Sequence, residues 1–375
     1  MGLNFEHTTL GQRVLFGTGR AGANLAAEVA RLGAKRVMVI SSASEARRLA
    51  AVTDSISVAL HYDDVAPHVP VKKAEKARAA ASENRIDLLV CAGGGSTTGL
   101  AKAIALTTRL PIIAIPTTYA GSEATNVWGL TEASRKTTGV DDAVLPVTVI
   151  YDAGLSLGLP VELSVASGLN ALAHCVDSLW GPRADPINAA LAAEGIRALN
   201  LALPAIKAHP VEPSGREQAL YGAYLAAVAF ASAGSGMHHK ICHVLGGAYN
   251  LPHAQTHAII LPHVLAYNAP YAAGAESRIA AAFGSARALD GLHALRKTLD
   301  APKALKDYGL AEENIPEAAR LILPAIPISN PRKVTVDDLQ ELLRHAYSGT
   351  APRLAPEDLG RRLSKTKQRL KTQAI

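Results

Sequence analysis

Residues 86–118 read IDLLVCAGGGSTTGLAKAIALTTRLPIIAIPTT, and this stretch decides the fold of the first part of the chain. The apolar run at 86–91 is too short for a helix, which predicts a strand buried on both faces. Residues 98–108 have helical spacing, and a second short apolar run follows at 111–115. A strand, a helix and a strand in this order predict parallel pairing, with the glycines at the carboxyl end of the first strand.

The same alternation continues outward through residues 1–153. Further strands are expected at 14–16, 36–40, 126–131 and 145–151, and further helices at 24–32 and 72–84. A polar turn carrying Arg135 and Lys136 is expected between the last two strands. The pattern predicts an α/β nucleotide-binding domain built on a doubly wound parallel sheet.

From residue 154 onward, long stretches rich in Ala and Leu have helical periodicity and few β-branched runs. This predicts an all-helical second domain over residues 154–356, packed closely on the first because no linker separates them. The apolar segment 218–239 contains Gln218, two tyrosines and three glycines, so we interpret it as one buried helix ending in a polar site rather than as a membrane span.

Composition excludes several classes of protein. The chain has 375 residues, too many for one compact core, and 49% of them are apolar, too many for a disordered chain. Three widely spaced cysteines exclude a disulfide framework, so the reducing cytoplasm is expected. The first residues have no basic segment followed by an apolar run, so we expect no signal peptide.

The net charge of +6 is concentrated at one end of the chain. Residues 361–375 hold six Lys or Arg and no acidic residue, so residues 1–360 are formally neutral. We therefore expect no basic groove for nucleic acid on the folded body, and we interpret residues 357–375 as a basic, solvated and flexible tail.

Two glycine clusters compete for a nucleotide. The first, GTGRAG at 17–22, matches G-x-G-x-x-G, but a dinucleotide site also needs an acid after the next strand. Ser41 and Ser42 stand there instead, so we interpret the first cluster as a turn. If these two serines face a cofactor, their uncharged hydroxyls predict that NADPH is tolerated along with NADH.

The second cluster is the stronger candidate. Gly94, Gly95 and Ser96 follow a buried strand and open a helix, where backbone N–H groups attract a pyrophosphate. The segment 116–123, PTTYAGSE, follows the next strand and is expected to reach the same edge of the sheet. Its candidate cofactor contacts are Thr117, Thr118, Tyr119 and Ser122.

Histidines are concentrated in the helical part. From 218 to 275 the only Lys, Arg, Asp or Glu is Lys240, yet the segment holds His238, His239, His243, His253, His257 and His263. Imidazoles in such a setting satisfy one another, bind metal or perform acid–base chemistry. So many of them favour a site over a core.

Helical spacing sharpens this reading, because His239 and His243 share a helix face, as do Asn170 and His174. An acid at position 170 would complete a site suited to iron or zinc. Since Asn170 is a weak neutral ligand, a catalytic metal is the less favoured interpretation.

Four segments together resemble the iron-containing alcohol dehydrogenase superfamily: GGGS at 93–96, PTT and GSE within 116–123, 170–174, and 236–253. The resemblance covers residues 5–354. It implies a nucleotide-binding α/β domain, a helical domain and a cleft between them. It also implies a homodimer formed through the first domain. The metal positions of the family correspond to Asn170, His174, His239 and His253, and His243 corresponds to a histidine near the reacting carbon.

Two departures point to one branch of the superfamily. The usual acid of the glycine-rich loop is Gly99 here, and the usual metal-binding Asp is Asn170. Together with residues 119–129, they resemble the maleylacetate reductase branch. This implies reduction of a dianionic oxo-acid, maleylacetate, to 3-oxoadipate in the breakdown of aromatic compounds.

For this reaction we expect NADH or NADPH as hydride donor and no catalytic metal. His243 is the first candidate for the acid, and His253, His239 and His174 are expected to line the pocket. Lys240 is a candidate anchor for the dianion, although it is as compatible with a solvent-facing position. By resemblance, Lys136 approaches the cofactor.

Three alternatives stay open. One is a metal-dependent alcohol or polyol dehydrogenase of the same superfamily, which needs a bound dication despite Asn170. Another is a lyase similar to dehydroquinate synthase, which shares the broad architecture and uses NAD without net redox. The third is a non-catalytic protein that binds nucleotide or stores metal.

Overall fold

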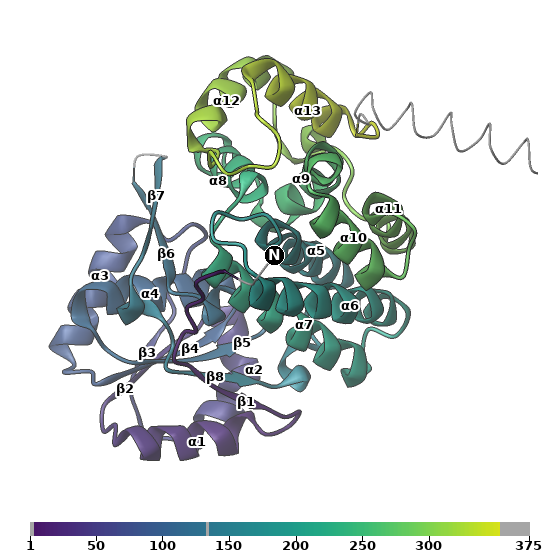
Figure 1. Ribbon diagram of the computed structural model, residues 1–375. Coiled ribbons are helices and arrows are strands. Elements are labelled where there is room, and N and C mark those ends of the chain that lie inside the picture. The colour runs from purple at the N-terminus through teal and green to yellow at the C-terminus, as the bar shows by residue number, and fades with distance from the viewer. Residues whose placement is uncertain (1–3, 133–134, 353–375) are drawn as a thin grey trace, which may run out of the picture.

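The computed structural model describes residues 4–132 and 135–352, and for residues 135 and 136 the backbone alone. Residues up to 151 form a parallel sheet with helices, and the chain beyond is helical, as expected (Figure 1). The predicted tail at 357–375 lies outside the described residues.

The sheet has six parallel strands in the order β1-β8-β5-β4-β2-β3. They are β1 (Arg13–Phe16), β2 (Val37–Ile40), β3 (Val58–Tyr62), β4 (Leu88–Gly93), β5 (Ile112–Pro116) and β8 (Thr148–Tyr151). After β2 the chain first turns outward to β3 and then crosses back to β4 on the other side. The point between β2 and β4 is therefore a topological switch point, where open α/β sheets bind their ligands.

The register brings the ends of three strands to one edge. Ile40 at the end of β2 lies beside Cys91, and Gly93 at the end of β4 lies beside Pro116 at the end of β5. Four helices accompany the sheet: α1 (Ala21–Leu32), α2 (Ala43–Thr53), α3 (Val71–Glu83) and α4 (Gly95–Thr108). The predicted glycine-rich loop therefore lies at the switch point.

A hairpin stands apart from this sheet, and here the sequence-based prediction was wrong. Strand β6 (Val127–Glu132) pairs with an unpredicted antiparallel strand, β7 (Arg135–Val140), where a polar turn was expected. The indole of Trp128 lies across Gly139, whose position leaves no room for a Cβ. The buried ammonium of Lys102 donates to the carbonyls of Thr125 and Val127 and holds the base of the hairpin.

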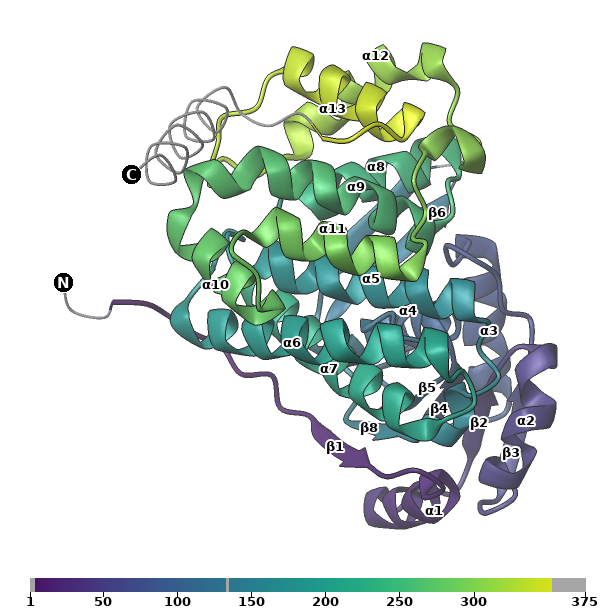
Figure 2. The same cartoon turned by 90° about the vertical axis from the view of Figure 1, so that its right-hand side faces the viewer.

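The helical half packs against one side of the α/β half (Figure 2). Its helices are α5 (Val161–Ser178), α6 (Pro186–Ala208), α7 (Pro213–Ala233), α8 (Met237–Tyr249), α9 (His253–Asn268), α10 (Ala273–Phe283), α11 (Ala288–Leu299), α12 (Ile315–Ile322) and α13 (Val336–Ser348). Small residues let α6 and α7 approach closely. A Cβ at Gly222 would lie 2.9 Å from the Cγ of Leu199.

The single helix predicted at 218–239 is in fact the end of α7 and the start of α8, which meet at an angle of 98°. Gly234 has a positive φ of 80° and ends α7, so the chain can turn before α8 begins. Helix α6, and α7 with α8 if taken as one span, are long and apolar enough to cross a membrane. Helix α6 packs against α5, α7 and α10 within the helical half.

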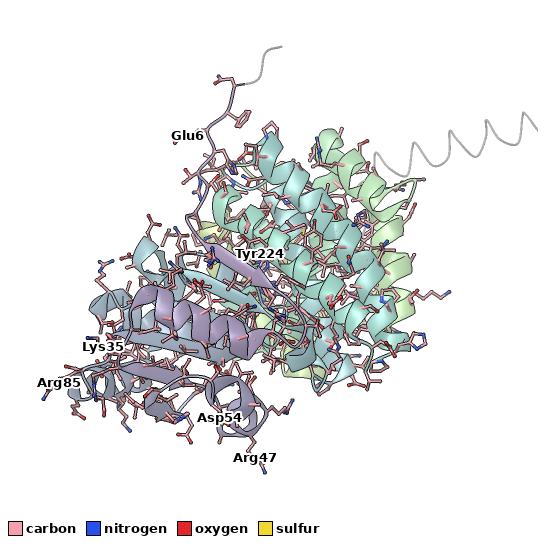
Figure 3. The ribbon with its side chains drawn as sticks, turned by 90° about the horizontal axis from the view of Figure 1, so that it is seen from below. Glu6, Lys35, Arg47, Asp54, Arg85 and Tyr224 are labelled. Atoms are coloured by element: carbon pink, nitrogen blue, oxygen red, sulfur yellow. The ribbon has the colours of Figure 1, made fainter. Side chains whose placement is uncertain are left out.

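One contact between the two halves joins β8 to α7. The ring of Tyr224 meets that of Tyr151 edge-on, with 5.9 Å between centroids, and Figure 3 shows Tyr224 between β1 and the helices. Charged side chains of both signs project from the outer side of the α/β half in the same view, namely Lys35, Arg47, Asp54 and Arg85.

Candidate active site

The first glycine cluster is closed by a side chain of the protein itself. The carboxylate of Asp152, just after β8, accepts hydrogen bonds from the backbone N–H groups of Gly19 (2.9 Å) and Ala21 (3.1 Å). It also accepts from the N–H of Gly154. Since these donors at the start of α1 are already used, the prediction of a turn is confirmed.

The second cluster is open and shaped for close approach. Gly94 caps α4 without a side-chain hydrogen bond, so N–H groups of the first turn remain available to an anion. Cβ atoms at Gly94 and Gly95 would lie 3.2 Å from Thr118 and 3.3 Å from Ala120. Glycines here bring the α4 N-terminus and the loop after β5 together. The arrangement fits a cofactor pyrophosphate.

Glu45 of α2 lies in the same crevice and was missed in the sequence. Its carboxylate accepts hydrogen bonds from the hydroxyls of Ser42 (3.0 Å) and Thr117 (2.7 Å). Ser41 is buried at the end of β2, with its N–H bonded to the carbonyl of Tyr62. We call Ser42, Glu45, Gly93–Gly95, Thr117 and Thr118 the cofactor crevice.

The other predicted cofactor residues have different positions. Tyr119 is fully buried and its hydroxyl accepts a hydrogen bond from Arg216 of α7, so this side chain is turned toward the helical half. Ser122 begins a short 3-10 turn, Ser122–Ala124. Lys136 lies in β7, and its side chain is outside the described residues.

One loop joins the crevice to the histidines. After β5, a Cβ at Gly121 would lie 3.5 Å from the imidazole of His174 in α5 and 2.8 Å from Ala227 in α7. Gly121 has a positive φ of 76°, which suits glycine at this close approach. The cofactor and histidine sites predicted separately from the sequence are therefore neighbours.

Six imidazoles from three helices form one connected group, the imidazole cluster: His174 of α5, His238, His239 and His243 of α8, and His253 and His257 of α9. Neighbouring ring centroids lie between 4.3 Å (His253 and His257) and 6.5 Å (His243 and His253) apart. His263 does not belong to it. Its buried ring has a pKa lowered to about 3, by desolvation and then by the charge of Arg296.

The cluster runs from the interior to the surface. His174, His238, His239 and His257 are buried, His243 is half-buried and His253 is exposed. Desolvation lowers the pKa of His174 to about 4 and, with neighbouring imidazoles, that of His238 to about 3. The inner rings are therefore neutral at pH 7, and His243 and His253 are the members of the cluster that solvent can reach.

Asp177 of α5 orients the cluster and was also missed in the sequence. Its Oδ2 lies 2.8 Å from Nδ1 of His239 and accepts the N–H of Gly236 at the start of α8. Burial raises the pKa of Asp177 to about 6, so the group is ionised at pH 7 and accepts the Nδ1 proton. Nε2 of His239 is thereby left with its lone pair.

The three histidines at the family's metal positions, His174, His239 and His253, do not form a set whose ligand atoms all lie within 4.8 Å of one another, whereas Nδ1 of His174, Nε2 of His239 and Oδ1 of Asn170 are buried without a hydrogen-bond partner among the described residues. His174 and His239 stack nearly parallel, with 4.7 Å between centroids, and the fourth member, Asn170, is neutral. Among the described residues, the one set of three His, Cys, Asp or Glu whose ligand atoms lie within 4.8 Å of one another is His238, Cys242 and His257. Ligand atoms around one dication lie within about 3.5 Å of each other.

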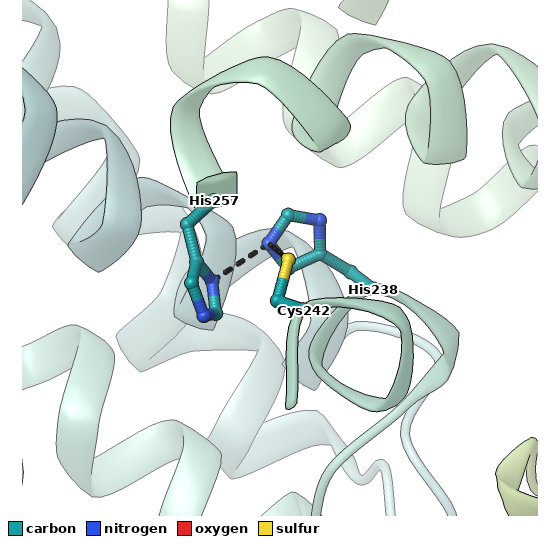
Figure 4. Close-up of side chains that lie close together, drawn as sticks. All are labelled: His238, Cys242 and His257. Carbon is teal, nitrogen blue, oxygen red and sulfur yellow. Dashed lines mark hydrogen bonds between the residues drawn. The ribbon is translucent and has the colours of Figure 1, made fainter. Parts of the chain in front are cut away.

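That set is itself closed by contacts between its members (Figure 4). Nε2 of His238 lies 2.9 Å from Nδ1 of His257, and the sulfur of Cys242 lies 3.7 Å from the same Nε2. Burial raises the pKa of Cys242 well above its usual value, so the group is a thiol rather than a thiolate ligand. We interpret the set as packing that holds α8 against α9.

Lys240, the single cation of this segment, is half-buried on α8, one residue after His239. Within 4–132 and 137–352 no side chain forms an ion pair or hydrogen bond with its ammonium. As the residue next to His239 on a helix, it projects about 100° around α8 from the face shared by His239 and His243, and its role as an anchor for the dianion stays a prediction.

Comparisons with known proteins agree on one family. A family model described as "Iron-containing alcohol dehydrogenase" matches residues 11–153, and "Fe-containing alcohol dehydrogenase family, C-terminal" matches residues 164–347. The maleylacetate reductase of Burkholderia cepacia is 45% identical over 91% of this chain and 97% of its own.

Solved structures give the same picture. An iron-containing alcohol dehydrogenase from Corynebacterium glutamicum is 63% identical, with a TM-score of 0.91 over 93% of this chain and 98% of that one. The maleylacetate reductase from Agrobacterium tumefaciens is 40% identical, with a TM-score of 0.87 over 93% and 99% of the two chains.

Proposed function

Because the chain belongs to the iron-containing alcohol dehydrogenase family and is an oxidoreductase, we propose that it reduces the carbon–carbon double bond of maleylacetate to give 3-oxoadipate. The observation that carries the proposal is the imidazole cluster, whose inner members are neutral. In addition, Asn170 stands at the position where the family has its metal-binding Asp. The likeness to the maleylacetate reductase of Burkholderia cepacia, over nearly the whole of both chains, supports the substrate.

The reaction consumes one hydride and one proton. A nicotinamide cofactor whose pyrophosphate is held by the cofactor crevice would supply the hydride. The double bond of maleylacetate is conjugated to a ketone, so hydride added to the carbon β to this ketone moves the π electrons onto the ketone oxygen as an enolate. A proton then adds to the carbon next to the ketone, which restores the carbonyl group. NAD(P)H, a proton and maleylacetate become NAD(P)⁺ and 3-oxoadipate.

His243 is our candidate for the group that delivers this proton. It is half-buried, four residues after His239 on the same face of α8, and His253 lies beside it at the surface, 6.5 Å away between ring centroids. A proton can therefore reach His243 from solvent while the inner rings stay neutral. Lys240 supplies a cation for a carboxylate of the substrate.

A metal is not needed in this proposal. A dication stabilises an isolated carbonyl or alcohol oxygen, whereas a conjugated ketone already draws electrons from the double bond. The likeness to an iron-containing alcohol dehydrogenase favours a second candidate function, metal-dependent alcohol oxidation. That function requires His174, His239 and His253 to converge with Asn170 on a dication.

The experiment is NAD(P)H oxidation with maleylacetate, followed by identification of the product, with simple aldehydes and alcohols as comparison substrates. We expect stoichiometric formation of 3-oxoadipate and turnover of the comparison substrates at least about 100-fold slower. Turnover of an alcohol with no turnover of maleylacetate would support the second function. We also propose that the protein forms a homodimer, on the basis of the family resemblance. We propose a cytoplasmic location because its three cysteines are buried and form no disulfide.

A further inference from the structure

Glu45 takes no part in the proposed chemistry, yet its carboxylate lies at the centre of the cofactor crevice. It bonds to Ser42 beside the end of β2 and to Thr117 beside the end of β5. Between them, at the end of β4, a Cβ on Gly93 would lie 2.5 Å from Oε2 of Glu45. The carboxylate thus spans three neighbouring strand ends, at the switch point of the sheet.

The chemistry of this position favours hydroxyl groups over phosphate. A carboxylate accepts hydrogen bonds and carries a negative charge, so it suits the two hydroxyls of a ribose and opposes a phosphate on the same sugar. The hydroxyls of Ser42 and Thr117 already donate to Glu45 and are not free to donate to a phosphate.

The nearest cations on α2 do not offset this charge. Arg47 is exposed and projects from the outer side of the α/β half (Figure 3). The guanidinium of Arg48 lies over Gly158, at the start of the helical half, where a Cβ would meet it at 2.5 Å. Helix α2 therefore presents a carboxylate to the crevice, and among the described residues neither arginine forms an ion pair with it.

We propose that Glu45 selects NADH over NADPH, by accepting hydrogen bonds from the adenosine ribose diol and repelling a 2′-phosphate. This inference rests on the proposed use of a nicotinamide cofactor. It replaces the expectation of NADPH tolerance, which considered Ser41 and Ser42 alone.

The test is the ratio of kcat/KM for NADH to kcat/KM for NADPH in the wild type and in Glu45→Gln, which keeps the shape and removes the charge. We expect the wild type to prefer NADH by about 100-fold, and the variant to lower this ratio by about tenfold or more, mainly through a lower KM for NADPH. The matched control is Glu83→Gln, which removes an exposed carboxylate at the far end of α3 and leaves the ratio unchanged.

Titration calorimetry with NAD⁺ and NADP⁺ separates the two levels of the argument. Binding of neither nucleotide would contradict the proposed function itself. Nucleotide binding with an unchanged preference in Glu45→Gln, or equal use of both cofactors by the wild type, would overturn the role of Glu45 and leave the proposed function standing. A shift of nucleotide preference toward NADP⁺ in Glu45→Gln, with no such shift in Glu83→Gln, supports the role of Glu45.

Discussion

The cofactor crevice and the imidazole cluster lie on either side of one loop, and they satisfy their polar atoms in opposite ways. In the crevice, the carboxylate of Glu45 is bonded on both oxygens, to Ser42 and Thr117. In the cluster, four buried ring nitrogens have no hydrogen-bond partner within the described part of the chain: Nδ1 of His174, Nδ1 of His238, Nε2 of His239 and Nε2 of His257.

This difference separates a binding surface from a reacting one. A preformed network of hydroxyls and a carboxylate discriminates between ligands and needs no change of protonation. Buried nitrogens without partners each cost about 1–3 kcal/mol, and such costs are typical of sites that do chemistry. The crevice is therefore expected to control which cofactor binds, and the cluster to control turnover and the pH dependence of stability.

Acidification should have the largest effect, and it acts through the cluster. The pKa values of His174 and His238 are lowered to about 4 and 3, so the unfolded chain takes up these protons first as the pH falls below 6.5. The free energy of unfolding must therefore fall between pH 6.5 and about 3, by up to about 1.4 kcal/mol per pH unit for each histidine. Asp177, with a raised pKa of about 6, acts in the opposite direction as a single group.

The measurement is urea unfolding at several pH values with a chelator present. We expect His238→Phe to flatten the pH dependence, whereas His209→Phe, at an exposed position after α6, leaves it as steep as in the wild type. A free energy of unfolding that stays constant from pH 7 to pH 4.5 would show that the cluster is not a buried neutral group.

His243→Ala should lower kcat by about 100-fold or more, because it removes the proposed proton donor. The KM for NADH should change by less than about threefold, because the crevice is untouched. Steady-state kinetics with circular dichroism checks both expectations, with His209→Ala as the control. Near-normal turnover would remove His243 from this role.

Asp177→Asn should lower kcat by about tenfold, because the ring of His239 loses the carboxylate that fixes its tautomer. The KM for NADH should again stay close to that of the wild type. Asp185→Asn is the matched control, since Asp185 is a buried carboxylate that caps α6 outside the cluster. It should lower the melting temperature and leave kcat unchanged. Equal kcat values in the two variants would contradict a positioning role for Asp177.

The elements around the glycine-rich loop were predictable because strands buried on both faces leave unambiguous apolar runs. Strands β4 and β5 lie within two residues of their predicted bounds. The two strands that the sequence did not predict, β3 and β7, gave no such signal. In β3, exposed and partly exposed residues alternate, and β7 acquires its strand character only by pairing with β6.

The residues of the candidate site also fall into those that the sequence predicts and those that it does not. The histidines were predictable, because many imidazoles in a stretch with one charged residue are unusual at any position in a fold. Glu45 and Asp177 were not, because a single acid on a helix resembles any solvent-facing residue. Tertiary structure alone brings Glu45 to Thr117, 72 residues away, and Asp177 to His239, 62 residues away. Likewise, Asp152 closes the first glycine cluster from 133 residues away.

The central claim is that this site reduces an activated double bond without a metal ion. The most direct test is the rate of NADH oxidation with maleylacetate by protein treated with a chelator and shown by elemental analysis to hold no transition metal. The account predicts the same kcat as before treatment, with one 3-oxoadipate formed per NADH consumed. Loss of turnover that returns when iron or zinc is added back would contradict it.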